Sequence, residues 1–466
     1  MKVLRAILVC CLILGALFAT RLLTGQTPAA TAAKDPGVRA GEVNAGNPIS
    51  SLSSTQLQYF QDGLLRFNEV EDVKGGLGPT FNSTSCGNCH SQPATGGTSP
   101  SVADYPNIGP NPQMAAANAE GATNRIPSFI TADGPVREAR FPFAVGSNGA
   151  VTRTPDGGVH ALFTVTGRSD AGGCSLAQPN FSAMQQANNL IFRIPTPVYG
   201  AGLIENISDA TILNNMRANP GLKAALGING HPNTSGNDGT ITRFGWKAQN
   251  KSLEVFSGEA YNVEMGVTNE LFPNERGAFP SSCQVNPTPE DGTNFDFDGV
   301  QLPSDAVVFA VFMRFLAPPT PSTVGIPGNP TAASIANGKA LFSQIHCDTC
   351  HTATLRTAVS AITPGLSNQN AALYSDLLVH NMGFGLSDRV AQGAAGADEF
   401  RTAPLWGLGQ RIFFLHDGRS GPANGGLVHA IAQHASNGSE ANRVIALYNN
   451  LTNQQKQDLL NFLRSL

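Results

Sequence analysis

The chain has 466 residues, a formal net charge of −4 and only 13% charged residues. This length allows one to three domains with buried cores, and the weak negative charge gives no support for binding to nucleic acid. The 50 glycines and 31 prolines indicate extensive irregular loop structure rather than long helices or regular sheets throughout.

The N-terminus has the pattern of an export signal. Lys2 and Arg5 precede an apolar run, Ala6–Ala19, which is short for a membrane span and long enough for a signal core. We therefore predict a signal peptide over residues 1–25, with an uncleaved membrane anchor as the alternative. Residues 26–50 are rich in Ala, Thr, Gly and Pro and predict a flexible tether.

The middle of the chain shows several regular elements. Apolar spacing predicts helices over Ser51–Phe67, Asp209–Arg217 and Ser304–Leu316, and β-branched residues predict a strand over Val159–Thr166. A proline run over residues 317–330 ends the third helix and predicts a domain boundary near residue 325.

A C-x-x-C-H motif occurs twice. Two thiols at this spacing can add to the two vinyl groups of one porphyrin, and the adjacent histidine can bind the iron. The alternative is one zinc site made from both cysteine pairs, but the pairs lie far apart and each is followed by histidine. We predict two covalently bound c-type haems, held by Cys86, Cys89 and His90 and by Cys347, Cys350 and His351.

Residues 326–466 have the pattern of a small cytochrome c domain. A helix is predicted over Ala333–Gln344, with Gly338 on one face, and Thr452 begins a capping box before a stripe of leucines. A glycine opposite such a stripe lets two helices cross closely. We expect a mainly α protein with minor β structure and two cytochrome c-like haem domains, residues 51–325, which carry a long insertion, and residues 326–466.

Two cysteines remain outside the signal and the haem motifs. An exported protein can form disulfides, and a bond between Cys174 and Cys283 would close a loop of about 110 residues. Two separate buried thiols are the alternative.

The sequence resembles the di-haem oxidoreductase family of peroxidase-like proteins, which is related to bacterial di-haem cytochrome c peroxidases and to MauG. The resemblance runs from about residue 56 to the C-terminus. It is carried, besides the haem motifs, by the segments Gly76–Asn82, Gly202–Glu205, Arg243–Gln249, Glu264–Thr268, Tyr374–Gly383, Thr402–Gly409 and Phe414–Arg419.

The ligand on the second side of each iron decides whether a haem carries electrons or binds peroxide. For the C-terminal haem the resemblance favours His434, with Met382 as the alternative, and places His416 near the pocket. For the N-terminal haem no histidine occurs from residue 91 to 159, which favours an open iron. His160 and His231 are remote candidates.

Peroxide cleavage needs an acid–base group and stabilisation of charge. Glu205 and Glu264 lie in segments that resemble the family, Arg243 could stabilise charge, and Trp246 could relay electrons between the haems. A structural role is the alternative for each of these residues.

The export signal and the haem motifs together predict a protein that is periplasmic or otherwise exported, and that is not an integral membrane protein once the signal is removed. The resemblance implies an oxidoreductase. Electrons would pass from a small redox protein through the C-terminal haem to the N-terminal haem, where hydrogen peroxide is reduced. The alternative is a di-haem electron-transfer cytochrome with no substrate chemistry.

Overall fold

The computed structural model describes residues 32–41, 44–100, 111–287, 294–295 and 301–466. The predicted signal peptide, residues 1–25, and the first part of the predicted tether lie outside the described residues. Within the described part of the chain, no helix is both long enough and apolar enough to cross a membrane.

Helices are the main regular structure. The α-helices are α2 (Ser54–Asn68), α3 (Cys86–Cys89), α4 (Pro112–Ala116), α5 (Phe181–Gln186), α6 (Ala201–Glu205), α7 (Asp209–Arg217), α8 (Pro220–Leu226), α9 (Leu253–Met265), α10 (Asp305–Phe315), α11 (Ala332–Gln344), α12 (Gly426–Gln433), α13 (Asn442–Asn449) and α14 (Asn453–Ser465).

The described strands are short and form sheets of two or three strands. They are β1 (Thr80–Phe81), β2 (Glu138–Arg140), β3 (Phe143–Val145), β4 (Val151–Pro155), β5 (Val159–His160), β6 (Phe163–Thr164), β7 (Ile191–Arg193), β8 (Asn294–Phe295), β9 (Gln301–Leu302), β10 (Leu355–Arg356), β11 (Asn370–Ala371), β12 (Val379–Asn381) and β13 (Glu399–Arg401). The prediction of a mainly α protein with extensive loop and minor β structure is confirmed.

The predicted helices are observed within a few residues of their expected bounds, as α2, α7, α10, α11 and α14. The predicted strand over residues 159–166 is instead two strands. Its first half, β5, pairs with β2, whereas its second half, β6, pairs with β1. The chain changes partner in the middle of the segment, and periodicity within one segment cannot show this.

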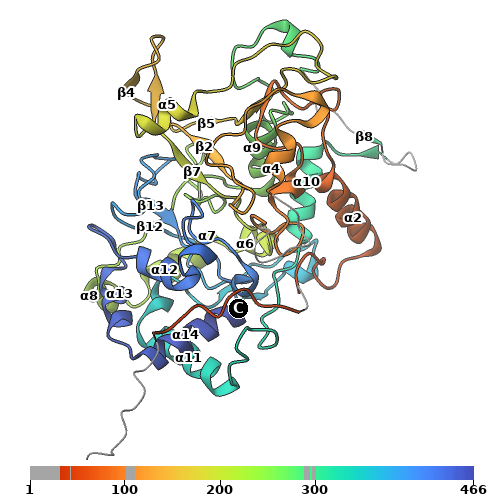
Figure 1. The fold of residues 1–466 in the computed structure, drawn as a ribbon. Helices are drawn as coiled ribbons and strands as arrows, with labels where there is room; N and C mark the ends of the chain where they lie inside the picture. The colour runs from red at the N-terminus through yellow and green to blue at the C-terminus, as the bar shows by residue number, and fades with distance from the viewer. Residues whose placement is uncertain (1–31, 42–43, 101–110, 288–293, 296–300) are drawn as a thin grey trace, which may run out of the picture.

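Two groups of helices hold the two haem motifs. In one half of the molecule α10 packs against α2 and α9, and in the other half α11 packs against α14 (Figure 1). The larger apolar core also includes Leu373 and Trp406 from the C-terminal segment, so the predicted boundary near residue 325 does not separate two independent cores.

Close helix crossings depend on glycines that lack a Cβ atom. A Cβ atom on Gly63 of α2 would lie 2.7 Å from the Cβ atom of Phe312 on α10. A Cβ atom on Gly338 of α11 would press on the carbonyl oxygen of Asp458 on α14. The predicted close crossing of the opening and closing helices of the C-terminal segment is therefore confirmed.

The described part of the predicted tether is not loose. The Asp35 carboxylate lies 2.8 Å from the Arg464 guanidinium of α14 and accepts a hydrogen bond from the backbone of Leu427. Arg39 is 1% exposed and donates to the carbonyl oxygen of Ser322 at 3.0 Å. The prediction of a flexible tether is wrong for these residues, because two charged side chains bind partners far away in the sequence.

Candidate functional site

The first C-x-x-C-H motif forms one wall of a cavity. The single helical turn α3 carries Cys86 and Cys89, and both thiols are free. His90 follows, and its Nδ1 atom lies 2.9 Å from the carbonyl oxygen of Gly97. Because a carbonyl oxygen only accepts hydrogen bonds, Nδ1 carries the hydrogen and the lone pair of Nε2 is left free. Burial lowers the pKa of His90 to about 4, so the ring is neutral.

The second motif repeats this arrangement in a separate cavity. Cys347 and Cys350 are also free thiols and line it together with His351. The Nδ1 atom of His351 lies 2.9 Å from the carbonyl oxygen of Tyr374. Burial lowers the pKa of His351 to about 4, which again leaves a neutral imidazole with a free Nε2.

Both cavities fit a c-type haem. Each offers two free thiols and a neutral imidazole whose orientation is held by a carbonyl oxygen, as is usual for metal-binding histidines. The unfilled space, part of it open to solvent, is about 1210 Å³ at the first motif and about 1450 Å³ at the second. Since the two cysteine pairs line different cavities, they do not form one zinc site.

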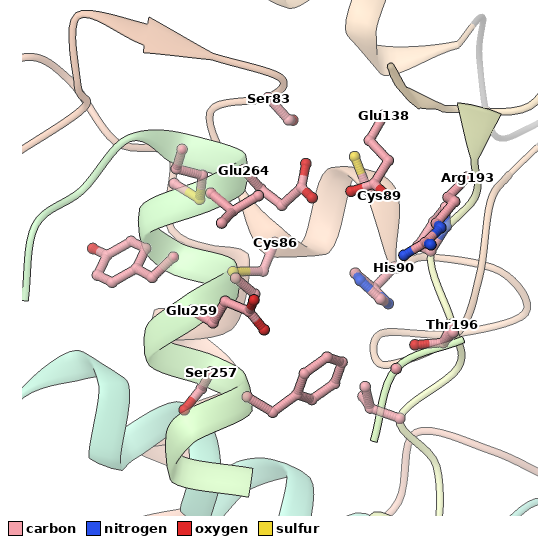
Figure 2. A pocket seen from close by; sticks show the side chains of 18 of the residues that line it. Ser83, Cys86, Cys89, His90, Glu138, Arg193, Thr196, Ser257, Glu259 and Glu264 are labelled. Carbon is pink, nitrogen blue, oxygen red and sulfur yellow. The ribbon is translucent and has the colours of Figure 1, made fainter. Parts of the chain in front are cut away.

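Carboxyl groups line the N-terminal cavity (Figure 2). Glu264 of α9 accepts a hydrogen bond from Asn82 at 2.8 Å, and Glu138 of β2 accepts one from Arg140 at 2.6 Å. The two carboxyl groups lie close enough to influence each other's ionisation. A third carboxylate, that of Glu259, lies on the same helix as Glu264 and accepts a hydrogen bond from an asparagine.

The two neighbouring carboxyl groups have opposite pKa shifts. Burial and the negative charge of Glu138 raise the pKa of Glu264 well above its usual range. Burial also opposes the ionised form of Glu138, but the positive charge of Arg140 outweighs this effect and lowers the pKa of Glu138. The two shifts favour a state in which Glu264 holds a proton and Glu138 is ionised, because two close carboxylates do not both ionise easily.

The C-terminal cavity contains further possible iron ligands. The Nδ1 atom of His434 lies 2.8 Å from the carbonyl oxygen of Ala430, which leaves its Nε2 free, and Met382 lines the same cavity. His416 also lines it, with its ring stacked on that of Phe400 at a centroid distance of 4.2 Å. The described residues thus bring both predicted sixth ligands to the haem motif and leave the choice between them open.

Trp246 lies between the two cavities and lines both. Its indole nitrogen donates a hydrogen bond to the carbonyl oxygen of Ile194 at 2.8 Å, and its ring meets the ring of His416 edge-on at a centroid distance of 6.4 Å. This contact places an aromatic ring between the N-terminal and C-terminal haem motifs.

Residues 149–466, well over half of the chain, match the family described as "Di-haem oxidoreductase, putative peroxidase". The chain belongs to the di-haem oxidoreductase family. The resemblance seen in the sequence is thereby confirmed, and the family implies haem cofactors. No curated protein matches this di-haem oxidoreductase.

Two solved structures share a weak likeness with the di-haem oxidoreductase. Hydrazine synthase of Kuenenia stuttgartiensis is 12% identical, with a TM-score of 0.32 over 95% of this chain and 98% of that one. A MauG-like protein associated with microbial copper homeostasis is 14% identical, with a TM-score of 0.34 over 95% of each chain.

Two of the predicted catalytic residues lie elsewhere in the di-haem oxidoreductase. Glu205 binds the Arg314 guanidinium at 2.7 Å and accepts the backbone N–H of Leu253 at the start of α9. Arg243 forms an ion pair with Asp209. Neither Glu205 nor Arg243 is among the described residues that line the haem cavities. A structural role explains both better than peroxide chemistry, because their charges are already satisfied.

The two remote histidines also lie away from the N-terminal cavity. His160 lies 3.1 Å from the Asp156 carboxylate and stacks on a phenylalanine ring. His231 lies 3.0 Å from Glu399, and its other ring nitrogen contacts a carbonyl oxygen. Neither His160 nor His231 is among the described residues that line this cavity.

Glu138, Arg140 and Arg193 line the N-terminal cavity and were not predicted from the sequence. They lie on β2 and β7, where Glu138 and Arg193 are cross-strand neighbours. Charged residues are few in this chain, so the closely spaced pair Glu138 and Arg140 could have marked this segment as part of a site. The sequence could not show the role of Arg193, because only the pairing of β2 with β7 places it beside Glu138.

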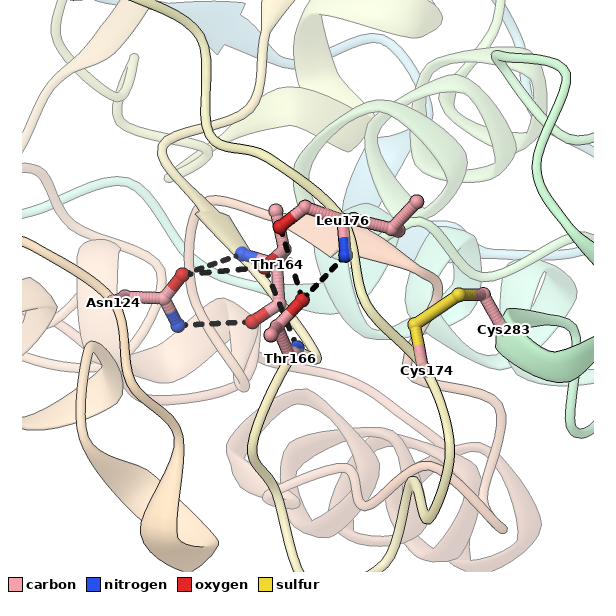
Figure 3. The surroundings of a disulfide bond; sticks show 6 residues. All are labelled: Asn124, Thr164, Thr166, Cys174, Leu176 and Cys283. Carbon is pink, nitrogen blue, oxygen red and sulfur yellow. Dashed lines mark hydrogen bonds between the residues drawn. A yellow bond between two sulfur atoms is a disulfide. The ribbon is translucent and has the colours of Figure 1, made fainter.

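Cys174 and Cys283 form a disulfide, with their Cα atoms 4.6 Å apart (Figure 3). Nearby, the Asn124 side chain bonds the backbone of Thr164, and the Thr166 hydroxyl binds the backbone of Leu176. The four remaining cysteines among the described residues are free and belong to the haem motifs.

Proposed function

We propose that this chain is an exported c-type di-haem oxidoreductase of the peroxidase type. A small redox protein would supply electrons at the C-terminal haem, and hydrogen peroxide would be reduced at the N-terminal haem. Cys86, Cys89 and His90 would hold one haem, and Cys347, Cys350 and His351 the other. Because c-type haem is attached outside the cytoplasm, the proposal includes a periplasmic location, and the disulfide is compatible with it.

The observation that carries the proposal is the difference between the two cavities. Of the described residues that line the N-terminal cavity, His90 is the only histidine, and carboxyl groups lie beside it. The C-terminal cavity instead offers the second imidazole of His434. One open site with acid–base groups and one closed site suited to electron transfer are the parts that a peroxidase needs.

The carboxyl pair of the N-terminal cavity can move a proton. A bound haem would supply the iron at which the peroxide bond is cleaved. Ionised Glu138 can accept a proton from the peroxide, and protonated Glu264 can donate one to the departing water. Arg140 stabilises the charge on Glu138 at 2.6 Å, which keeps the two carboxyl groups in different protonation states.

The function is tested by electron paramagnetic resonance of the oxidised holoprotein, recorded before and after addition of peroxide. We expect a high-spin ferric signal, from the N-terminal haem, that changes with peroxide, and a low-spin signal that does not. Two low-spin signals that are indifferent to peroxide, in both the fully oxidised and the half-reduced protein, would contradict the peroxidase proposal.

A di-haem electron-transfer cytochrome is the second candidate function. Met265 of α9 and Met313 of α10 are buried and line the N-terminal cavity, and a thioether is a possible sixth ligand for c-type haem. If one of them binds the iron, both haems are closed and the same resonance experiment shows two low-spin centres.

A further inference from the structure

Two arginines lie in the wall of the C-terminal cavity. Arg401 is the last residue of β13, and Arg411 directly follows the short 3₁₀ helix η5 (Leu408–Gln410). Arg401 is 8% exposed and Arg411 is 7% exposed. Both side chains line the cavity of the second haem motif and a smaller cavity beside it that includes Trp406.

Among the residues that the structure describes, no acidic group matches the charges of these two arginines. Arg401 donates from Nε to the carbonyl oxygen of Gly245 at 3.1 Å. Within the described chain, neither Arg401 nor Arg411 forms an ion pair with a carboxylate, and the Arg411 guanidinium makes no hydrogen bond. Several other buried arginines are paired with carboxylates, as Arg193 is with Asp388 at 2.6 Å and Arg464 with Asp35 at 2.8 Å.

Two neighbouring buried cations without anions are costly. Burial and, to a lesser extent, the positive charge of Arg411 lower the pKa of Arg401 to about 10. Burial alone lowers the pKa of Arg411 to about 10. Such a pair is stable only if a ligand brings negative charge into the cavity, and a guanidinium is well shaped to bind a carboxylate through two hydrogen bonds.

We infer that Arg401 and Arg411 bind the two propionate carboxylates of the C-terminal haem. The inference rests on the proposed attachment of this haem at Cys347 and Cys350, which line the same cavity as both arginines. A haem carries two propionates, so the two positive charges would be matched by two negative ones. The guanidinium charges would also favour the less positive, reduced iron and so raise the reduction potential of this haem.

The test replaces each arginine separately, as Arg401→Gln and Arg411→Gln, in the holoprotein. The readout is spectroelectrochemical titration of the two haems. We expect each change to shift the reduction equilibrium of the C-terminal haem about tenfold toward the oxidised form, which corresponds to 59 mV for one electron. The N-terminal haem should keep its potential, and Arg401→Lys and Arg411→Lys should recover part of the shift.

Arg356→Gln is the matched control, because this arginine is exposed and does not line the cavity. It removes the same charge and should leave both potentials unchanged. The inference is overturned if Arg401→Gln and Arg411→Gln behave like this control.

A second measurement does not depend on the folding of variants. In the wild-type protein, phosphate or chloride should not change the potential of the C-terminal haem, since the arginines already hold the propionates. A phosphate-dependent or chloride-dependent potential would show an exchangeable anion and overturn the inference. The mass of the intact chain, measured first, separates the two proposals: absence of covalent haem would contradict the haem attachment itself.

Discussion

Glu264 and Glu138 show how two identical chemical groups acquire different roles from their neighbours. Glu264 faces a second carboxyl group and a low-polarity wall, so its neutral form is favoured. Glu138 faces Arg140 and remains ionised. The difference between their pKa shifts depends on charges within a few ångströms. Single substitutions therefore test it most directly.

The first prediction concerns the pH dependence of activity. Glu264 can donate a proton only while it is protonated, so the kcat/KM for peroxide should fall as the pH rises through its raised pKa. In Glu264→Gln, which does not titrate, kcat/KM should drop by roughly 10²–10⁴-fold and this alkaline decline should disappear. Glu254→Gln, on the exposed face of the same helix, is the control. An alkaline decline retained in Glu264→Gln would rule out this role.

The second prediction concerns the sixth ligand of the C-terminal haem. If His434 binds the iron, His434→Gly should convert the low-spin signal of this haem to high spin, and added imidazole should restore it. Met382→Leu is the comparison variant, because Met382 lines the same cavity. A low-spin signal that is lost in Met382→Leu and kept in His434→Gly would assign the ligand to Met382.

Among the elements, the crossing of α11 and α14 forms the core of the C-terminal segment. The two helices approach closely at Gly338, opposite Asp458 and Phe462. Their facing side chains, Phe342, Leu459, Leu460 and Leu463, belong to one apolar core, which packs beside the second haem motif. The crossing therefore links helix packing to the shape of the haem cavity.

The third prediction is that Gly338→Ala destabilises the protein. The new methyl group would collide with the carbonyl oxygen of Asp458 and lie 2.8 Å from the Cβ atom of Phe462, and overpacking of this kind costs about 1–3 kcal/mol. Thermal unfolding followed by circular dichroism should show a lower midpoint. The neighbouring exposed position provides the control, Asn337→Ala, which should not lower the midpoint. An unchanged midpoint in Gly338→Ala would contradict the close crossing.

The fourth prediction concerns the disulfide, which ties the loop at Cys174 to the 3₁₀ turn at Cys283, 109 residues further along the chain. Removing both thiols, as Cys174→Ser with Cys283→Ser, should reduce the free energy of unfolding by roughly 4–5 kcal/mol in the chain-entropy model. Denaturant unfolding measures the change. A reducing agent should destabilise the wild-type protein to a similar extent and leave the double variant unaffected. If the reducing agent destabilised both proteins equally, the result would argue against the disulfide.

At the scale of the whole molecule, the central feature is the placement of Trp246 in the walls of both haem cavities. The residue belongs to a segment between α8 and α9, and its ring meets His416 from the C-terminal segment. If electrons pass between the two haems as proposed, the Trp246 ring is the side chain that borders both cavities.

The fifth prediction follows from that placement. Trp246→Phe should slow electron transfer from the reduced C-terminal haem to the N-terminal haem, measured by rapid mixing of the half-reduced protein with peroxide. Trp406→Phe is the matched control, because Trp406 lines the small neighbouring cavity and neither haem cavity among the described residues. Equal rates in wild type and Trp246→Phe would remove the relay role.

Local patterns predicted much of what was found. The motifs at Cys86 and Cys347 and the helix over residues 209–217 depend on short stretches of chain, so they could be recognised before the fold was known. The errors were non-local. Glu205 was predicted as a catalytic residue because its partner, Arg314, lies far along the chain. The buried Arg39 was predicted to lie in a flexible tether because its partner, the carbonyl oxygen of Ser322, is also distant in sequence.

The local chemistry could be recognised from the amino-acid order alone: two sets of thiols and imidazole at the spacing required for c-type haem, and two cysteines left to pair. The surroundings of those motifs depend on the folded chain. Folding placed Glu138 against Glu264, gave Arg401 and Arg411 no acidic partner among the described residues, and set Trp246 between the cavities. The physical reason is that covalent attachment depends on adjacent residues, whereas pKa values, charge balance and electron routes depend on groups that only folding brings within a few ångströms.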